Sequence, residues 1–490
     1  MLANKLSDKM DIQKTIYTAF TAAVVLFSFL GLFTDNLFLA AVPIGIFGII
    51  AIIKDYRILY YGFWAVLPFS VEIYLGSFGT DLPTEPFMLG LTGIAFIVFI
   101  NNMSSVSLKH LYHPISILVI FHLVWMLFTC LFSQSPLISY KFFLAKLWYV
   151  IPFFFLSFHM IKELANVQLI VKILSVCLTV AIGIVLVRHA IDGFTFVGSH
   201  HVVRPIFRNH VNYSAIIVTV LPFIWALYKN TDSGIYKKYL LLALVIFVVG
   251  TYFSYTRAAQ LCIFISIGAF FIFKYKLGRI AILVSCLMAI LLVSYLSINN
   301  KYLDFAPDFE NTVAHKQFDN LLEATLKMED ISTMERVYRW IAGSQMIQER
   351  PLTGFGPSSF YTHYTKYTVR SFETYVSDNP EKSGIHSYYL MTLVEQGIIG
   401  FLIFLGLIFS IILGGERVYH QLKDEKAKRY IMAATLSTVV ICALCLINDL
   451  IEADKIGPFF FLNASLIVIS DFKSREKKSK DKEPLSPSRN

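Results

Sequence analysis

The sequence predicts an all-α integral membrane protein, a polytopic transmembrane bundle of about 12 to 14 spans with one large extracytoplasmic helical loop. Of the 490 residues, 56% are hydrophobic and only 15% are charged, whereas water-soluble proteins carry about 25% charged residues. Apolar runs of about 15 to 25 residues recur along the chain, which suits helices that cross roughly 30 Å of hydrocarbon. Continuous runs such as 16–33 and 240–253 exclude an outer-membrane barrel, whose strands are short alternating segments.

We predict 14 spans, with the count least determined at the third span, which carries Glu72, and at the short fourth and fourteenth. Their expected starts lie near residues 16, 37, 59, 87, 114, 138, 168, 211, 239, 258, 280, 387, 430 and 456. Lys and Arg gather in alternate connections, including 229–238, 274–279 and 417–429, whereas 76–86 carries only acids. Because short cytoplasmic loops are enriched in Lys and Arg, we expect both termini in the cytoplasm.

This topology divides the chain into four parts. We expect an N-terminal transmembrane bundle (1–299), a large extracytoplasmic loop (300–385), C-terminal transmembrane helices (386–472) and a disordered cytoplasmic tail (473–490). Within the loop, an amphipathic stretch at 315–346 precedes a Pro and Gly-rich breaker at 351–357. That pattern predicts a small helical subdomain outside the membrane.

Several functional classes receive no support from composition. The net charge of +9 follows the distribution of basic residues over loops, so it does not indicate nucleic-acid binding. All six cysteines lie inside apolar runs, and neither a disulfide framework nor a metal-site spacing is visible. We expect no cofactor and no metal. Lysines precede the first span without a small-residue cleavage site, so we expect that span to be retained.

The predicted outer face gathers cationic groups, although short outside loops are normally poor in arginine. These groups are Arg204, Arg208, Arg257, Arg336, Arg339 and His386. Arginine's rigid fork of donors suits phosphate or diphosphate, and it stays charged near lipid. The alternative is that these side chains snorkel to lipid headgroups or pair with loop acids such as Glu335.

His386 stands directly before an apolar span, where a neutral imidazole can accept a proton from a sugar hydroxyl. Nearby arginines would lower its pKa and favour the neutral form. The alternative is a histidine that caps the span. Glu395 lies on the opposite side of the same helix, so we expect it to contact a neighbouring helix. Asp449 and Glu452, in the turn after the thirteenth span, are supporting candidates for holding an arginine or an acceptor sugar, or form a solvated loop.

Four stretches carry a resemblance to a known family. They are Arg257 followed by three residues and Leu261; His386-Ser387 with Gly397 and Gly400; 336–340 running into the turn at 351–357; and 204–212 before the eighth span. Together they resemble the bacterial O-antigen ligase and polymerase superfamily over roughly residues 200 to 415. The sequence departs from the family at Asn209-His210, and the family more commonly has about 12 spans.

The resemblance implies a membrane glycosyltransferase of the GT-C type in the bacterial cytoplasmic membrane. Such an enzyme takes a glycan from undecaprenyl diphosphate and attaches it to an acceptor hydroxyl at the outer face. Arg204, Arg257, Arg336 and Arg339 would bind the diphosphate. His386 would receive the acceptor's proton, with Arg257 and Arg336 sharing in catalysis and inversion as the outcome. The expected partners are therefore the lipid-linked donor, a saccharide acceptor and membrane lipids.

The acceptor decides among related activities. Lipid A core means a ligase, which the family label favours; a growing glycan means a polymerase; and a Ser or Thr side chain means protein glycosylation. The alternatives from other classes are a lipid-linked oligosaccharide flippase and a non-catalytic glycan-lipid binder. A flippase needs charged groups through the bundle and access from both faces, whereas the predicted arginines collect on one face.

Overall fold

The computed structural model describes residues 26, 52–75, 78–101, 108–232, 234–299, 301, 331–369, 377 and 384–480. The chain divides into two compact units, residues 1–62 and 63–490. Nearly all of the described residues belong to the second unit. The spans predicted near residues 16 and 37 lie outside the described residues, apart from Leu26, which is helical.

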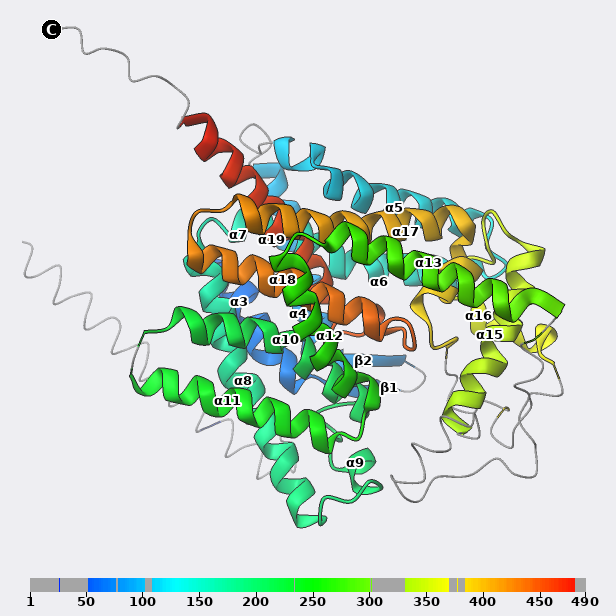
Figure 1. Ribbon diagram of the computed structural model, residues 1–490, viewed down its shortest axis with the longest axis horizontal. Helices are drawn as coiled ribbons and strands as arrows, with labels where there is room; N and C mark the ends of the chain where they lie inside the picture. The colour runs from blue at the N-terminus through cyan, green and yellow to red at the C-terminus, as the bar shows by residue number, and fades with distance from the viewer. Residues whose placement is uncertain are drawn as a thin grey trace, which may run out of the picture. The chain divides into compact units, whose positions relative to one another are not determined.

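Ten helices in the described part of the chain are long and apolar enough to cross a membrane. Each begins within a few residues of a predicted start, which confirms a multi-pass helical membrane protein (Figure 1). They are α4 (Thr84–Asn101), α5 (Pro114–Leu131), α6 with its extension α7 (Pro136–Met160), α8 (Leu164–Ile191), α10 (His210–Asn230), α11 (Ile235–Phe253), α12 (Arg257–Lys274), α13 (Gly278–Ser297), α17 (Tyr388–Gln421) and α18 (Glu425–Leu444).

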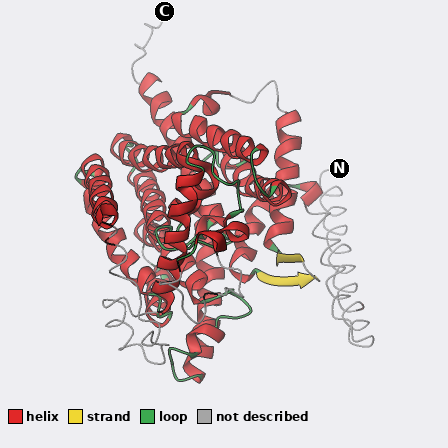
Figure 2. Ribbon diagram, turned by 90° about the vertical axis from the view of Figure 1, so that its right-hand side faces the viewer, coloured by secondary structure: helices red, strands yellow, loops and turns green. Residues whose placement is uncertain are grey.

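The third predicted span, near residue 59, is wrong. In its place stand a ten-residue helix, α3 (Arg57–Val66), a 3₁₀ turn (Leu67–Phe69) and an antiparallel hairpin of β1 (Val71–Leu75) and β2 (Phe78–Leu82). Pro68 stops the helix because its ring cannot continue the hydrogen-bond ladder. The hairpin pairs Glu72 with Asp81 and stands out in yellow among the helices (Figure 2), so the fold is not purely α-helical.

The predicted last span forms as α19 (Gly457–Lys480), but its polar second half keeps it out of the ten apolar helices. The helix continues past Phe472 to Lys480, so the expected disorder of the tail is wrong for 473–480. Residues 481–490 lie outside the described part. The α19 side chains before Asp471 are nearly all buried, against α18, α17 and the π-helical turn at Ile151–Phe155, which joins α6 (Pro136–Val150) to α7 (Ser157–Met160).

Part of the predicted large loop is described, as α15 (Ile331–Glu349), α16 (Phe360–His363) and a 3₁₀ turn (Tyr364–Tyr367). The amphipathic helix predicted at 315–346 is therefore seen from Ile331 onward, and 315–330 falls outside the described residues. The loop has an apolar core of its own that includes Ala342, Met346 and Phe355, and Val394 of α17 joins it. This core fixes the loop to the first turns of α17.

Within the second unit, α10 and α18 lie at the centre, since most of each helix is buried. α10 packs on α18 and α11, and α17 packs on α18 and α5. In contrast, Gly278 is the one buried residue of α13, and the rest of this helix is exposed or half-buried, which suits a helix that faces lipid. These contacts bring the first residues of α10, α12 and α17 to one end of the bundle.

The long helix α17 is broken at Gly397, whose backbone has φ 68° and ψ −175°. A break leaves carbonyl groups without helical donors. The amides of Phe355 and Gly356 donate to the carbonyls of Val394 and Glu395, both at 2.9 Å. The turn predicted at 351–357 therefore replaces the missing turn of the helix.

Glu395 strengthens the same junction. Its carboxylate accepts the backbone amides of Ser358 (2.7 Å) and Phe360 (3.2 Å). We expected Glu395 to contact a neighbouring helix, but it binds the loop that follows the turn. A buried carboxylate is stable there because it accepts backbone donors that would otherwise be unpaired.

The break predicts a glycine requirement at position 397. An added Cβ would lie 2.1 Å from the carbonyl oxygen of Leu352, in addition to a positive φ that L-residues avoid. We expect Gly397→Ala to destabilise the protein by at least about 1–2 kcal/mol, measured as the thermal midpoint in detergent. Gly268→Ala in α12, where nothing lies within 4 Å of the added carbon, is the matched control and should not lower the midpoint. Equal midpoints for the two variants would contradict this role of the break.

Candidate functional site

His386 lies in the short segment between the large loop and α17, and α15 holds that segment through its backbone. Arg339 donates from Nη1 to the carbonyl of Gly384 at 3.4 Å, and Trp340 donates from Nε1 to the carbonyl of Ile385 at 3.1 Å. The backbone of His386 itself is left-handed, with φ 55°. Such a conformation persists only where surrounding contacts impose it, and it is common at functional sites.

Asp449, from the turn after α18, binds the same segment from the other side. The backbone N–H of His386 donates to Asp449 Oδ2 at 3.2 Å. The second oxygen, Oδ1, is buried and has no hydrogen-bond donor among the described residues. Ser387 then caps α17 by accepting the amide of Leu390. His386 is thus fixed between α15 and the turn that carries Asp449.

Arg339 is almost fully buried and forms an ion pair with Glu335, one turn earlier in α15, at 3.2 Å. Its Nε is buried without a hydrogen-bond acceptor in the part of the chain that the structure describes. The pair with Glu335 is the loop-acid alternative weighed above for these arginines. Arg339 therefore holds the backbone before His386 in place while it is paired with Glu335.

The electrostatic setting keeps the His386 imidazole neutral. Burial, together with the charges of Arg336 and Arg339, lowers the pKa of His386 to about 3. This agrees with the expectation that nearby arginines favour the neutral form. Burial raises the pKa of Asp449 to about 7, and the nearby charge of Glu452 raises it further, against the hydrogen bond from the His386 backbone. The segment thus combines a neutral base with a carboxyl group that titrates near neutral pH.

Arg336 joins this segment to the starts of α10 and α12. Its charge acts on His210, the first residue of α10, as well as on His386. Thr256, the residue before Arg257, donates to the carbonyl of His210 at 3.3 Å. Arg257 therefore begins α12 beside a histidine that lies within the electrostatic reach of Arg336. The structure brings three of the predicted residues, Arg257, Arg336 and His386, to one region.

Two histidines that the sequence analysis did not single out line this region. The rings of His210 and His200, the latter in α9 (Gly198–His201), lie 4.2 Å apart between centroids. The Nδ1 atom of His210 is buried without a hydrogen-bond partner among the described residues. Asn209 caps α10 by accepting the amide of Asn212, which gives the departure from the family at Asn209-His210 a local structural role.

Glu452 forms an ion pair with a buried lysine that was not predicted from the sequence. Lys146 of α6 is 1% exposed, and its ammonium donates to Glu452 and to the hydroxyl of Tyr388 (3.2 Å). Tyr388 donates to Glu452 in turn, at 2.7 Å. A lysine inside an apolar run is costly unless it is paired, and that signal could have identified Lys146.

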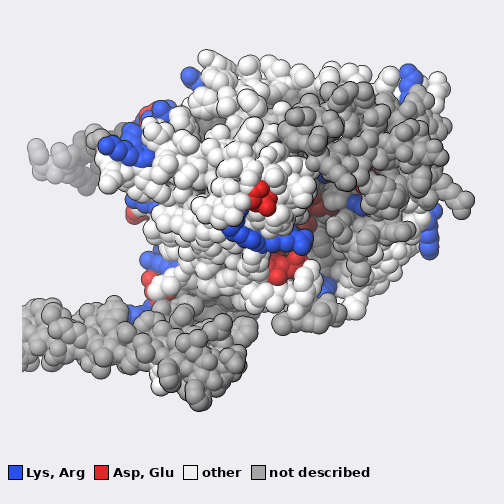
Figure 3. Space-filling view, turned by 90° about the horizontal axis from the view of Figure 1, so that it is seen from below, with Lys and Arg blue, Asp and Glu red and all other residues white. Residues whose placement is uncertain are grey.

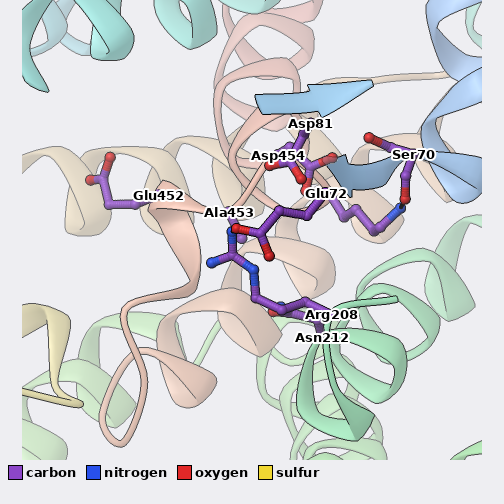
Figure 4. A pocket seen from close by; sticks show the side chains of 9 residues that line it. Ser70, Glu72, Asp81, Arg208, Asn212, Glu452, Ala453 and Asp454 are labelled. Carbon is purple, nitrogen blue, oxygen red and sulfur yellow. Dashed lines mark hydrogen bonds and ion pairs between the residues drawn. The ribbon is translucent and has the colours of Figure 1, made fainter. Parts of the chain in front are cut away.

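The structure separates Arg204 and Arg208 from His386. Arg204 is exposed, and its Nε donates to the carbonyl of Arg208 at 3.3 Å, within its own segment. Arg208 forms an ion pair with Glu72 of β1, and Figure 4 shows it directed toward the hairpin. Neither guanidinium is among the charges that act on His386.

In Figure 3 a compact group of acidic and basic side chains lies near the middle of the face drawn, and further charged side chains lie toward its edges. Among the described residues, no three His, Cys, Asp or Glu side chains gather so that they could hold a metal ion. The charges that act on His386 are those of Arg336 and Arg339.

The comparison with protein families agrees with the resemblance noted in the sequence. Residues 242–405 match the family model described as O-antigen ligase. The match covers about a third of the chain, so this segment is similar to the O-antigen ligase family. The O-antigen ligase segment contains Arg257, Arg336, Arg339 and His386, whereas Arg204, Asp449 and Glu452 lie outside it. No curated protein sequence matches the chain.

The raised pKa of Asp449 predicts a pH-dependent contribution to stability. In the folded chain the carboxyl group of Asp449 stays protonated up to about pH 7. In the unfolded chain an aspartate carboxyl loses its proton near pH 3.9. Stability should therefore fall as pH rises from about 4 to 7 and stay lowered above that range. Asp449→Asn removes this loss, so its stability relative to wild type should rise by on the order of 2–4 kcal/mol between pH 4 and pH 8.

Thermal midpoints at pH 4, 6 and 8 measure this effect. Asp232→Asn, at an exposed position between α10 and α11, is the control. A difference between Asp449→Asn and wild type that stays constant over this pH range would contradict the assignment.

Proposed function

We propose that this protein transfers a glycan from undecaprenyl diphosphate to an acceptor hydroxyl at the outer face of the bacterial cytoplasmic membrane. The observation that carries the proposal is the His386 segment, which Arg339 and Asp449 hold through its backbone within the electrostatic reach of Arg336. A base that stays unprotonated next to fixed positive charge suits a reaction in which a hydroxyl loses a proton while an anionic group leaves.

In the proposed reaction one bond forms, one bond breaks and one proton moves, and a side chain of this protein receives the proton. The acceptor oxygen forms a bond to the anomeric carbon of the donor sugar, the bond from that carbon to the diphosphate breaks, and the bond electrons leave with the lipid diphosphate. The hydroxyl proton passes to the imidazole of His386. Attack from the face opposite the leaving group inverts the anomeric carbon. We infer a metal-independent reaction in which arginines supply the charge.

Arg257 and Arg336 are the proposed diphosphate ligands, with Arg204 as a weaker one because it is exposed and bonded within its own segment. Arginine stabilises a departing diphosphate because its charge persists near lipid and its donors match phosphate oxygens. For Arg339 the ion pair with Glu335 favours a positioning role, since its other bond goes to Gly384 beside His386. Asp449 positions His386 through the backbone.

The direction in which the site faces follows from the helices that carry it. α10, α12 and α17 each begin at the site, and their far ends carry Lys229, Lys274 and Arg417. Basic residues mark cytoplasmic connections. The end with His386 is therefore proposed to face the outside, where a lipid-linked glycan would be assembled onto its acceptor.

The family's description as O-antigen ligase supports lipid A core as the acceptor. A growing lipid-linked glycan, which would make the protein a polymerase, is the alternative from the same family. The difference lies in the acceptor alone, so the proposed chemistry at His386 is common to both.

The proposal predicts that single changes at the site remove transfer. We expect His386→Asn, Arg336→Ala and Arg257→Ala each to slow glycan transfer by roughly 100-fold or more. Asparagine is chosen at position 386 because it tolerates the left-handed backbone there. Arg279→Ala, at the exposed start of α13 outside the site, is the control and should transfer normally.

The assay uses the full chain in nanodiscs with an undecaprenyl-diphosphate-linked repeat unit, with and without lipid A core, and resolves products on a gel. A product that requires core identifies a ligase, and a ladder without core identifies a polymerase. Normal transfer by His386→Asn would contradict the role of the imidazole. Donor movement across proteoliposomes without any product would contradict transfer itself and favour a flippase.

A further inference from the structure

A second polar site lies beside the first, between the β-hairpin and the turn that carries Glu452. It is a cavity of about 70 Å³ that is partly open to solvent. The hairpin, the start of α10 and the turn after α18 supply its walls (Figure 4). The lining residues are Ser70, Glu72, Asp81, Arg208, Asn212, Glu452, Ala453, Asp454 and Lys455.

One wall of this cavity is buried and rigidly held. Lys455 is 4% exposed, and its ammonium donates to the backbone carbonyls of Leu67 (3.0 Å) and Ser70 (2.9 Å). Asp454 is 9% exposed and accepts a hydrogen bond from Thr84 Oγ1 at 3.0 Å. Side chains fixed in this way keep their positions when a ligand binds, which lowers the entropy lost on binding.

The cavity also presents hydrogen-bonding groups that the protein itself leaves unused. Within the described residues, the carboxylate of Asp81 and the side-chain amide of Asn212 make no hydrogen bond, and Asp454 uses one oxygen, Oδ2. Asp81 and Asn212 are half-buried, so a polar ligand that enters the cavity can bond to them in place of water. A carboxylate accepts hydrogen bonds, and a side-chain amide both donates and accepts them. These groups therefore complement a ligand that carries several hydroxyl groups.

The charge of the cavity argues against a second phosphate site. Four carboxylates, those of Glu72, Asp81, Glu452 and Asp454, face two cations, Arg208 and Lys455, and Glu452 is also paired with Lys146. Burial and the neighbouring charge of Asp454 together raise the pKa of Asp81 to about 7. The cavity therefore offers no excess of positive charge to a phosphate, whereas the region around His386 carries arginines. The two sites therefore favour ligands of different chemistry.

Glu452 links the cavity to the proposed catalytic region. Its side chain lines the cavity and accepts a hydrogen bond from the hydroxyl of Tyr388, which stands two residues after His386. The same turn also carries Asp449, which binds the His386 backbone. A molecule that extends from the cavity past Glu452 reaches the region of His386.

We propose that this cavity binds a neutral sugar residue of the acceptor, through hydroxyl groups bonded to Asp81, Asn212 and Asp454. The inference rests on the proposed function and names where the acceptor is held. A small cavity that is open to solvent suits the terminal residue of a longer glycan. The site therefore positions the acceptor, and the arginine region holds the diphosphate of the donor.

The test separates acceptor binding from donor binding in the full chain in nanodiscs. Asp81→Asn preserves shape and removes a charged acceptor of hydrogen bonds, and Ala453→Leu fills the cavity without touching its polar groups. For both we expect the KM for the acceptor to rise roughly tenfold, with kcat and the affinity for undecaprenyl diphosphate unchanged. The acceptors used are lipid A core and a second molecule of the lipid-linked repeat unit, whichever wild type extends.

Glu85→Gln is the matched control, because Glu85 lies beside the hairpin, accepts a bond from Thr80 at 2.7 Å and does not line the cavity. An acceptor KM for Asp81→Asn and Ala453→Leu equal to that of Glu85→Gln would overturn the inference and leave the proposed function standing. A rise in the KM for the donor instead would also overturn it. A wild-type protein that binds undecaprenyl diphosphate but forms no product would refute the proposed function itself.

Discussion

The break in α17 at Gly397 is the constraint on which the geometry of the site depends. Because the backbone of Gly397 is not helical, the carbonyls of Val394 and Glu395 need other donors, and the turn after α15 supplies them. That pairing fixes α15 against the first turns of α17. Only from this position do Arg339 and Trp340 reach the backbone just before His386. A local interruption of one helix thus aligns a loop helix with the candidate base.

The charged groups of the outer end fall into two environments with different consequences. Around His386, burial and the charges of Arg336 and Arg339 keep the imidazole neutral. Around the hairpin, carboxylates outnumber the cations that line the cavity, and Asp81 makes no hydrogen bond through its carboxylate to the described residues. Glu452 belongs to both, since it lines the cavity and is bonded to Lys146 and Tyr388. Such a division suits a transferase that must hold an anionic donor and a neutral acceptor side by side.

Hydropathy predicted most of the fold, because each span is a local property of the sequence. The third span was misread since Pro68 and the alternation around Glu72 produce a short helix and a hairpin. Order and spacing also predicted Arg257, Arg336 and His386 as site residues, and the structure brings them to one region. The ion pair between Lys146 and Glu452 could not be predicted, because these residues lie 306 positions apart in the sequence. His210 and the cavity at Asp81 could not be predicted either, because their neighbours in the fold come from distant segments of the sequence.

The most direct test of the central claim is an experimental structure of the chain in nanodiscs with undecaprenyl diphosphate bound. The account predicts diphosphate density within hydrogen-bond distance of the guanidinium groups of Arg257 and Arg336, facing the imidazole of His386. Diphosphate density in the cavity beside Asp81 and Asp454, or at the opposite basic end near Arg417, would contradict it.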